Sequence, residues 1–302
     1  MVENEMRKAT GIVLTRNFDS GDLRISVVTP SLNMAPYIEG TIKSVIGNLK
    51  EGDEYFVIDG GSTDGSTDII RRYEDHITGW VSENDAGYAD ALAKGFARAS
   101  GDILCWINAG DIYLAGALDA ARKLMTDDLD MIFGDDFYID EANTILAYSR
   151  GWVPNLRMAM LYGGWTPLQD ACFWRCSLYR KIGGLDRSLR YAADYDLFLR
   201  MALAGRTGYV PLTFSAFRRH TGQKSISGST AYEDERKRVR AREIGAHRSA
   251  SLPKALYRGV NRVAMSARAR LAPLAWRRPD LVGRLVTSLP CAAYWPAAAD
   301  RL

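Results

Sequence analysis

The sequence predicts an α/β protein built on a doubly wound, mostly parallel sheet, with a helical extension at its C-terminal end. As far as about residue 135, short apolar stretches rich in β-branched residues alternate with helical stretches, which is the pattern of strand–helix–strand units. The loops after these strands are rich in Asp, Asn, Ser and Gly, and none of them is a minimal connector. Ligands of such sheets bind at the carboxyl ends of the strands, so these loops are the predicted functional region.

The individual elements follow from hydrophobic spacing. Strands are expected where apolar residues run together between turn residues, and helices where apolar residues recur every three or four positions. Thr67 or Asp68 is expected to cap the helix after the second strand. The expected strands are residues 24–31, 54–59, 77–83, 102–109 and 129–135, and the expected helices are residues 36–49, 68–75, 89–99 and about 115–125.

Beyond residue 135 the hydrophobic periodicity of the sequence becomes mixed. Residues 137–151 suggest a hairpin, a helix is expected to start near Asp194, and residues 208–220 have the composition of a strand. The chain from residue 231 onward is rich in Arg and Ala and helical in propensity, although prolines interrupt it. The predicted organisation is a polar leader (residues 1–23), a main domain (24–229) and a basic helical tail (230–302).

The composition indicates a globular protein of the cytoplasm. Of the 302 residues 47% are hydrophobic and 25% are charged, and every apolar stretch ends before the roughly 20 residues that a membrane helix needs. The first ten residues lack the apolar core of a signal peptide. Cys172 and Cys176 are close in sequence, but a metal site would need further ligands nearby, so the four cysteines are expected to be reduced and packed as small apolar residues.

The net charge of +3 hides an asymmetry along the chain. From Thr230 onward there are fifteen Lys and Arg against six Asp and Glu, a balance of +9, so the rest of the chain carries −6. A mildly acidic body can hold a divalent cation and bind an anionic ligand through it, whereas a basic tail suits an anionic surface.

The loop after the second expected strand, DGGSTDGS, is rich in glycine. It has no Lys after it and its spacing fits neither a phosphate-binding P-loop nor a dinucleotide fingerprint, which argues against both of those protein classes. Asp59 ends a hydrophobic strand there, where its carboxylate can accept a hydrogen bond from the N–H of a base. For Ser62, Thr63 and Ser66, a role in turn formation and helix capping is preferred.

Other polar residues at predicted strand and helix ends suggest a metal and a base. Asn108 and Asp111 follow the fourth strand and offer the oxygen ligands that Mg²⁺ or Mn²⁺ prefers, although a simple turn explains them as well. His220, preceded by two arginines, can complete a metal shell or can be an ordinary packed residue. Asp194 and Asp196 flank a helix start, where one carboxylate can act as a general base; helix capping is the stronger alternative for Asp196.

Five segments in this order resemble the family 2 glycosyltransferases. They are ISVVTPSLN, VIDGGSTDGSTDII, SENDAGYADALAKGFARASGDILCWINAGD, PLQDACFWRCSLYRKIGGLD and AADYDLFLRM, and the resemblance covers about residues 24–228. It implies a Rossmann-like GT-A fold and an enzyme that transfers a sugar from a nucleotide-diphosphate sugar to a hydroxyl acceptor with inversion at the anomeric carbon. Surface polysaccharide or related glycan assembly is the implied setting.

The resemblance implies where the donor binds. Pro30, Ser31 and Leu32 would line the nucleobase pocket, and Asp59 would hydrogen-bond the base. The residues near the ribose and the diphosphate would be Asp85, Gly87 and Asp90.

It also implies a Mg²⁺ or Mn²⁺ ion. The NAGD segment, from Asn108 to Asp111, takes the place of the family's metal-binding acidic motif, and His220 matches a downstream His that often joins the metal shell. In this chain Gly110 replaces the first of the paired acids, so Asp111 would hold the ion with less help and the affinity for metal would be weaker.

Asp194 matches the family's catalytic Asp, which would deprotonate the acceptor hydroxyl. Ala193 replaces the acidic neighbour that is common in the family, and the loss of that negative charge should leave the pKa of Asp194 less elevated.

Sugar rings stack on aromatic faces, so the segment from residue 165 to 174 is expected to shape the acceptor side, with core packing as the alternative for Phe173 and Trp174. The expected acceptor-side residues are Trp165, Gln169, Asp170 and Trp174.

The basic tail leaves three interpretations. Contact with an anionic membrane surface is favoured, because Arg-rich helical segments accompany Trp276 and Trp295 and because many relatives act on lipid-linked acceptors. A helical subdomain over the acceptor cleft is the second, and nucleic-acid binding ranks last and is not expected. Two other functions stay open for the whole protein: a sugar-phosphate nucleotidyltransferase, and a catalytically degenerate relative that binds nucleotide sugar.

Overall fold

The computed structural model describes residues 23–153, 155–163, 165–220, 229–246 and 294–295. The expected leader, apart from its last residue, and most of the expected tail lie outside the described residues. Trp276, on which the membrane interpretation partly rests, lies outside them as well.

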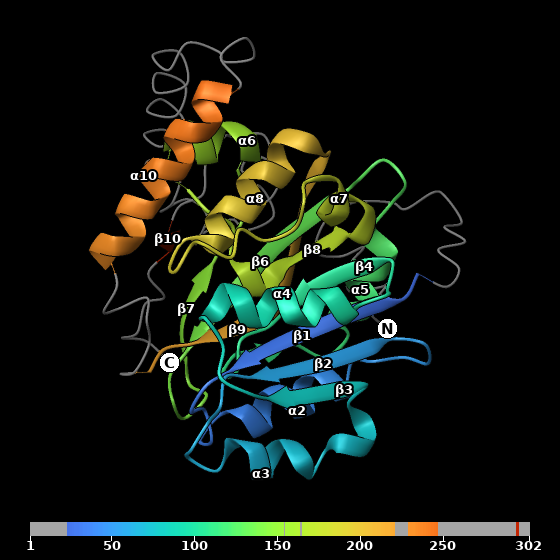
Figure 1. Ribbon diagram of the computed structural model, residues 1–302. Helices are drawn as coiled ribbons and strands as arrows, with labels where there is room; N and C mark the ends of the chain where they lie inside the picture. The colour runs from blue at the N-terminus through green and yellow to red at the C-terminus, as the bar shows by residue number, and fades with distance from the viewer. Residues whose placement is uncertain (1–22, 154, 164, 221–228, 247–293, 296–302) are drawn as a thin grey trace.

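One mixed sheet forms the centre of the molecule (Figure 1), in the order β10-β7-β6-β8-β4-β1-β2-β3, with β9 beside β6 and β5. The pairs β3–β2, β2–β1 and β1–β4 are parallel, which confirms the predicted parallel half of the sheet. The strands are β1 (Ile25–Ser31), β2 (Glu54–Asp59), β3 (Gly79–Ser82), β4 (Ile103–Trp106), β5 (Ile112–Tyr113), β6 (Met131–Ile139), β7 (Ile145–Ser149), β8 (Cys172–Arg175), β9 (Thr207–Arg218) and β10 (Tyr294–Trp295).

The second half of the sheet differs from a simple alternating pattern. The predicted hairpin is present as β6 and β7, but β8 lies between β4 and β6 and runs antiparallel to both. Trp174 of β8 pairs with Leu104 on one side and with Met131 on the other. A four-residue strand followed at once by a helix carries no detectable periodicity, so the sequence did not predict β8.

The helices flank both faces of the sheet (Figure 1). The predicted cap of α3 is wrong: the helix starts at Ser66 after Gly65, whose φ of 95° suits glycine, and Asp64 accepts the hydrogen bond from the backbone N–H of Ser66 at 3.0 Å. The helices and helical turns are α2 (Ile38–Ile46), α3 (Ser66–Arg71), η1 (Glu74–His76), α4 (Tyr88–Arg98), α5 (Ala117–Leu124), α6 (Leu156–Met158), η2 (Ala159–Gly163), η3 (Gln169–Ala171), α7 (Cys176–Lys181), α8 (Ala193–Ala204) and α10 (Ser229–Ala246).

Alternate strand residues build a core on each face of the sheet. Val27 and Ile103 pack toward α2, α3 and α5, whereas Val28 and Trp106 pack toward α4, α7 and α8. In the second core the rings of Trp106 and Phe198 are stacked, with centroids 5.4 Å apart and an interplanar angle of 5°. This contact fixes α8 against the sheet beside β4.

Trp174 is fully buried among the same rings, 5.2 Å from Trp106 and 5.7 Å from Phe96 between centroids. The structure therefore places Trp174 in the core, as the packing alternative had it, and not on an acceptor surface; Phe173 is buried on the opposite face. Cys105, Cys172 and Cys176 are buried and free, and Cys291 lies outside the described residues.

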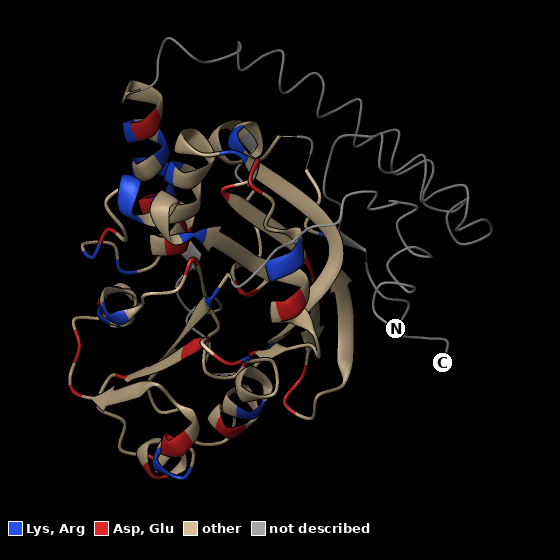
Figure 2. Ribbon diagram, turned by 90° about the vertical axis from the view of Figure 1, so that its right-hand side faces the viewer, with Lys and Arg blue, Asp and Glu red and all other residues tan. Residues whose placement is uncertain are grey.

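The first helix of the expected tail is part of the folded body. α10 packs along α8, with Val239 buried in the core and Tyr232 and Ile244 packed against it. Figure 2 shows acidic as well as basic residues on this helix. Within the part of the chain that the structure describes, no helix is both long enough and apolar enough to cross a membrane.

Candidate active site

The loops after β1 and β2 are bound to each other at the carboxyl edge of the sheet. The backbone N–H of Asn33 donates to Ser62 Oγ at 2.7 Å, the N–H of Thr63 donates to Asn33 Oδ1 at 2.9 Å, and the N–H of Met34 donates to Ser66 Oγ at 2.9 Å. The three hydroxyl residues of the glycine-rich loop thus lie in cross-links between two loops. The cross-links hold the two loops together at the carboxyl edge of the sheet.

Asp59, at the end of β2, is fully buried. Its carboxylate accepts hydrogen bonds from the hydroxyls of Ser62 (2.5 Å) and Ser82 (2.7 Å) and from the backbone N–H groups of Ser62 and Gly61. In this structure Asp59 therefore organises the loop after β2. Its Oδ2 accepts three of these hydrogen bonds and its Oδ1 accepts one.

Leu32, Gly60 and Asp85 meet where three loops converge. A methyl group added at Gly60 would lie 2.7 Å from Asp85 Oδ2 and 3.5 Å from Leu32 Cδ1, so a larger residue would require the Asp85 side chain to move. Leu32 is 47% exposed, an apolar side chain among polar loops. Pro30 and Ser31 are buried beneath it at the end of β1.

The loop after β3 is held by its own carboxylates. Asp85 accepts from the backbone N–H of Gly87 at 2.8 Å, and the φ of 119° at Gly87 lies in the left-handed region. Asp90, only 4% exposed, accepts from the N–H of Ala86, which lowers its pKa, and forms ion pairs with Lys94 and Arg187. The carboxylate of Asp90 is thus committed to the protein, and the charge exposed beside it is cationic.

Arg187 was not singled out by the sequence. Its side chain is 61% exposed, and its ion pair with Asp90 brings the loop before α8 against α4. A single Arg in a loop carries no pattern, so only the fold reveals its position. It places a positive charge beside the loop predicted to approach the diphosphate.

The loop after β4 contains Asp111, which is 3% exposed. Its Oδ1 accepts the backbone N–H of Arg218 at 2.8 Å, and its Oδ2 accepts Asn108 Nδ2 at 3.3 Å. The guanidinium of Arg218 donates to the carbonyl of Gly110, also at 2.8 Å. The end of β9 is therefore bound to the loop that was predicted to hold the metal, and Arg218 serves that link instead of offering a free cation.

Three buried carboxyl groups interact near this loop. Burial raises the pKa of Asp111 well above its usual range, and the negative charge of Asp170 adds to the effect. Burial also raises the pKa of Asp136, again with Asp170 contributing, and raises that of Asp170 to about 6. Ser215 Oγ donates to Asp136 Oδ1 at 3.1 Å. Asp136, on β6, was missed because a pair of acids inside a strand gives no signal of function.

Several buried polar atoms around these carboxyl groups have no hydrogen-bond partner among the described residues. Buried polar groups are normally paired, so a gathering of orphaned ones indicates where a polar ligand binds. They include both side-chain polar atoms of Gln169, both oxygens of Asp170, Asp136 Oδ2 and Asn108 Oδ1. The nearby Trp165 is partly buried, with its ring 6.0 Å from that of Phe133.

The predicted pairing of Asp111 with His220 is not a preformed metal centre. The ring of His220 lies against Tyr37, with centroids 5.3 Å apart, and burial lowers its pKa. In the described ranges no group of three or more His, Cys, Asp or Glu side chains is arranged to hold a metal ion. The orphaned carboxylate oxygens are nevertheless hard ligands of the kind that Mg²⁺ and Mn²⁺ accept, so a cation fits here if the remaining ligands come from a substrate and water.

Asp194 lies in the first turn of α8 and is partly exposed. Its Oδ1 accepts the backbone N–H of Tyr195 at 2.7 Å. Burial raises its pKa to about 6, against the opposing effects of backbone hydrogen bonds and the charge of Arg236. A carboxyl group with that pKa can exchange a proton near neutral pH.

Tyr88 lies within electrostatic range of three of these acids. Its hydroxyl accepts Trp106 Nε1 at 2.7 Å, and its pKa is raised by burial and by the negative charges of Asp194, Asp111 and Asp170. Three acids that are far apart in sequence therefore lie near one phenol. Asp59 is buried at the end of β2, opposite Ser31 of β1.

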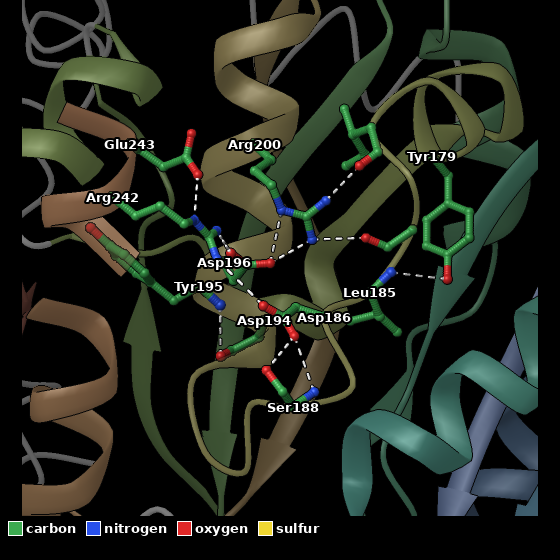
Figure 3. Close-up of polar contacts among 12 residues, drawn as sticks. Tyr179, Leu185, Asp186, Ser188, Asp194, Tyr195, Asp196, Arg200, Arg242 and Glu243 are labelled. Carbon is green, nitrogen blue, oxygen red and sulfur yellow. Dashed lines mark hydrogen bonds and ion pairs between the residues drawn. The ribbon is translucent and has the colours of Figure 1, made fainter. Parts of the chain in front are cut away.

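Asp196 has a different role from Asp194 (Figure 3). It is fully buried and forms ion pairs with Arg242 and with Arg200, whose Nε lies 2.8 Å from its Oδ2. Asp196 binds α8 to its surroundings, so the preference for a structural role is correct, although the contact is an ion pair and not a cap.

Solved structures share this fold. The Staphylococcus aureus TarS fragment 1–349 in complex with UDP-GlcNAc gives a TM-score of 0.59 at 17% identity, covering 78% of this chain and 69% of that chain. The mannosyltransferase PcManGT from Pyrobaculum calidifontis in complex with GDP-Man and Mn²⁺ gives a TM-score of 0.52 at 19% identity, covering 95% of this chain and 90% of that chain. Both are GT-A glycosyltransferases, so the predicted GT-A fold is confirmed.

Proteins related in sequence are also named as glycosyltransferases. The uncharacterized glycosyltransferase Rv1514c of Mycobacterium tuberculosis is 34% identical over 186 residues, which cover 59% of this chain and 69% of the relative. TuaG of Bacillus subtilis, a glycosyltransferase named for teichuronic acid biosynthesis, is 33% identical over 104 residues, which cover 33% of this chain and 41% of the relative. The model of glycosyl transferase family 2 matches residues 26–182, and with these relatives it shows that the chain is a glycosyltransferase of family 2.

Proposed function

We propose that this enzyme transfers a sugar from a nucleotide-diphosphate sugar to a hydroxyl acceptor with inversion, and that Asp194 is its general base. One observation carries the proposal above the others. Asp194, with a pKa of about 6, acts on the same buried phenol, Tyr88, as Asp170, whose two carboxyl oxygens have no partner among the described residues. Such a site can take a proton from a hydroxyl group that those polar groups orient.

The donor is proposed to lie across the carboxyl edge of the sheet. Leu32 would cover the base, Pro30 and Ser31 would form the floor, and Asp59 would accept a base N–H. Asp85 and Gly87 would lie along the ribose and diphosphate, while Asp90 would act through Arg187, whose charge offsets that of the phosphates. The two solved neighbours in complex with UDP-GlcNAc and GDP-Man support this class of donor.

The reaction needs one displacement. Asp194 accepts the proton of the acceptor hydroxyl, the hydroxyl oxygen forms a bond to the anomeric carbon, and the bond from that carbon to the diphosphate oxygen breaks on the opposite face. Attack opposite the leaving group inverts the configuration, and no covalent intermediate on the protein is required. A Mg²⁺ or Mn²⁺ ion, held by Asp111 with Asn108 nearby, would stabilise the charge on the leaving nucleoside diphosphate.

The acceptor is proposed to be a glycan or a lipid-linked glycan. Gln169 and Asp170, whose buried polar atoms lack partners among the described residues, would bind its hydroxyl groups, and Trp165 would contact a sugar ring. The name of TuaG supports a role in surface polysaccharide synthesis. Contact of residues beyond 246 with the inner face of the cytoplasmic membrane belongs to the same proposal.

The test is release of nucleoside diphosphate from a panel of UDP- and GDP-sugars with and without Mn²⁺. Asp194→Asn should lower turnover by about 10² to 10⁴, because the amide cannot accept the proton, with binding of the nucleoside diphosphate retained. Asp186→Asn, eight residues earlier and partly exposed, is the control. Unchanged turnover in Asp194→Asn removes that residue as base.

The other two functions give different products in the same assay. Release of pyrophosphate from a nucleoside triphosphate and a sugar phosphate would identify a nucleotidyltransferase. Binding of donor with no product in the wild type would identify a degenerate relative.

A further inference from the structure

The backbone that leads into the helix carrying Asp194 is held by another helix. Ala192, at the cap position of α8, has only a methyl group and accepts no hydrogen bond. The three N–H groups up to and including Ala192 are bound from α10, more than forty residues later in the chain. Glu235 accepts the backbone N–H groups of Arg190, Tyr191 and Ala192 at 3.1, 2.8 and 2.9 Å.

Glu235 is suited to this contact because it is both buried and ionised. Its exposed fraction is 7%. Burial by itself would raise the pKa of Glu235, but the three backbone hydrogen bonds outweigh it and hold the pKa below the usual range. A carboxylate that accepts three N–H groups from consecutive residues makes charge-assisted hydrogen bonds and fixes that segment of backbone.

α10 also contacts α8 on the other side of Asp194. The guanidinium of Arg236 lies over the ring of Tyr195, 5.3 Å from its centroid, and its charge lowers the pKa of Asp194. Arg242 forms an ion pair with Asp196 (Figure 3). The backbone two residues before Asp194 and the side chain immediately after it are therefore both held by the same helix.

We propose that Glu235 is a positioning residue for Asp194, so that α10 belongs to the catalytic unit and not to a separate tail. The inference rests on the proposed function, because it assumes that Asp194 is the base. Ala192 lies two residues from Asp194, and a shift of this backbone moves the carboxylate by a comparable distance. Displacements of about 1 Å at a reacting group can lower rates about a hundredfold. α10 lies outside residues 26–182, which the family model matches.

The test compares Glu235→Gln and Glu235→Ala with Asp234→Asn, a neighbouring change on the exposed face of α10, where Asp234 pairs with Lys237. Kinetics use UDP-N-acetylglucosamine or GDP-mannose, whichever turns over, with kcat counted per nucleoside-diphosphate-binding site. We expect kcat to be highest in the wild type, lower in Glu235→Gln and lowest in Glu235→Ala, which should lose at least tenfold. KM for the donor should change less than threefold. Glutamine keeps one acceptor oxygen, so the kcat of Glu235→Gln should lie between those of the wild type and Glu235→Ala.

The pH profile separates positioning from a merely structural role. Loss of the Glu235 charge and entry of water both favour ionised Asp194, so the acidic limb of kcat should move to lower pH in Glu235→Gln. Asp234→Asn should match the wild type. A wild-type kcat and pH profile in folded Glu235→Gln, or a loss of rate that disappears when kcat is counted per binding site, overturns the inference. Full activity of Asp194→Asn would instead refute the proposed function itself.

Discussion

The backbone N–H of Arg218 donates a 2.8 Å hydrogen bond to Oδ1 of Asp111, although the two residues are 107 positions apart. This bond joins the end of β9 to the loop after β4. It orients a carboxylate that stands in the place of the family's metal-binding motif, and it uses one of the two oxygens. Asp111 is thus held by the protein before a ligand binds.

Asp111→Asn should separate the structural role of this side chain from its proposed metal role. An amide oxygen can still accept the N–H of Arg218, so we expect a folded protein. Because burial raises the pKa of Asp111, removal of its charge should also raise the midpoint of thermal unfolding at pH 7. The loss of the charge should raise the Mn²⁺ concentration needed for half-maximal turnover at least tenfold. Turnover measured against Mn²⁺ concentration checks this, and activity in the wild type that resists a chelator would argue against any metal at Asp111.

The rate should depend on the ionisation of Asp194. Because the base must be unprotonated and its pKa is raised to about 6, kcat/KM should rise with pH and level off above about pH 7. Arg236→Gln removes a positive charge that lowers this pKa, so the midpoint should move to higher pH. Profiles of both proteins between pH 5 and 9 test the prediction; coincident profiles would show that Arg236 does not act on the base.

Asp170 should make the ligand-free protein less stable as the pH rises. Its folded-state pKa of about 6 exceeds the ordinary value of 3.8, so the folded state binds more protons than the unfolded state between about pH 4 and 6. The free energy of unfolding therefore falls as the pH rises through this window. Asp170→Asn cannot titrate and should be more stable than the wild type at pH 7, by roughly 1 to 3 kcal/mol. Urea unfolding at pH 4, 5.5 and 7 measures the difference; a constant difference across these values would contradict the linkage.

The stack of Phe198 on Trp106 should be a main contact of α8. Phe198 is fully buried, so Phe198→Ala removes a large side chain from the core and should lower the free energy of unfolding by about 3 to 5 kcal/mol. Leu146→Ala is the control, because Leu146 is 42% exposed on β7 and its truncation should cost less than about 0.5 kcal/mol. If both variants lost the same free energy of unfolding in urea, Phe198 would not be a main contact of α8.

Much of the site could be predicted because its loops follow strands with strong local patterns. Asp111 and Asp194 were singled out by their position at an element end; burial raises the pKa of both, and the charge of Asp170 adds to the effect on Asp111. The assignment of Trp174 to the acceptor side failed because aromatic composition cannot distinguish a binding wall from a core. Arg187 and Asp136 were missed because neither an isolated Arg in a loop nor a pair of acids in a strand forms a sequence pattern that indicates function.

By itself the sequence determined the parallel strands, the helices between them, the family and the order of the functional loops. The strands and helices depend on the spacing of apolar residues along the chain, whereas the family was identified from the resemblance of five short segments. Only the tertiary structure decided that β8 enters the sheet antiparallel, that Asp59 organises its own loop, and that Glu235 binds the N–H groups of the backbone leading into α8. Those facts depend on which distant groups are buried together, because a polar group removed from water must find its partner wherever the fold places one.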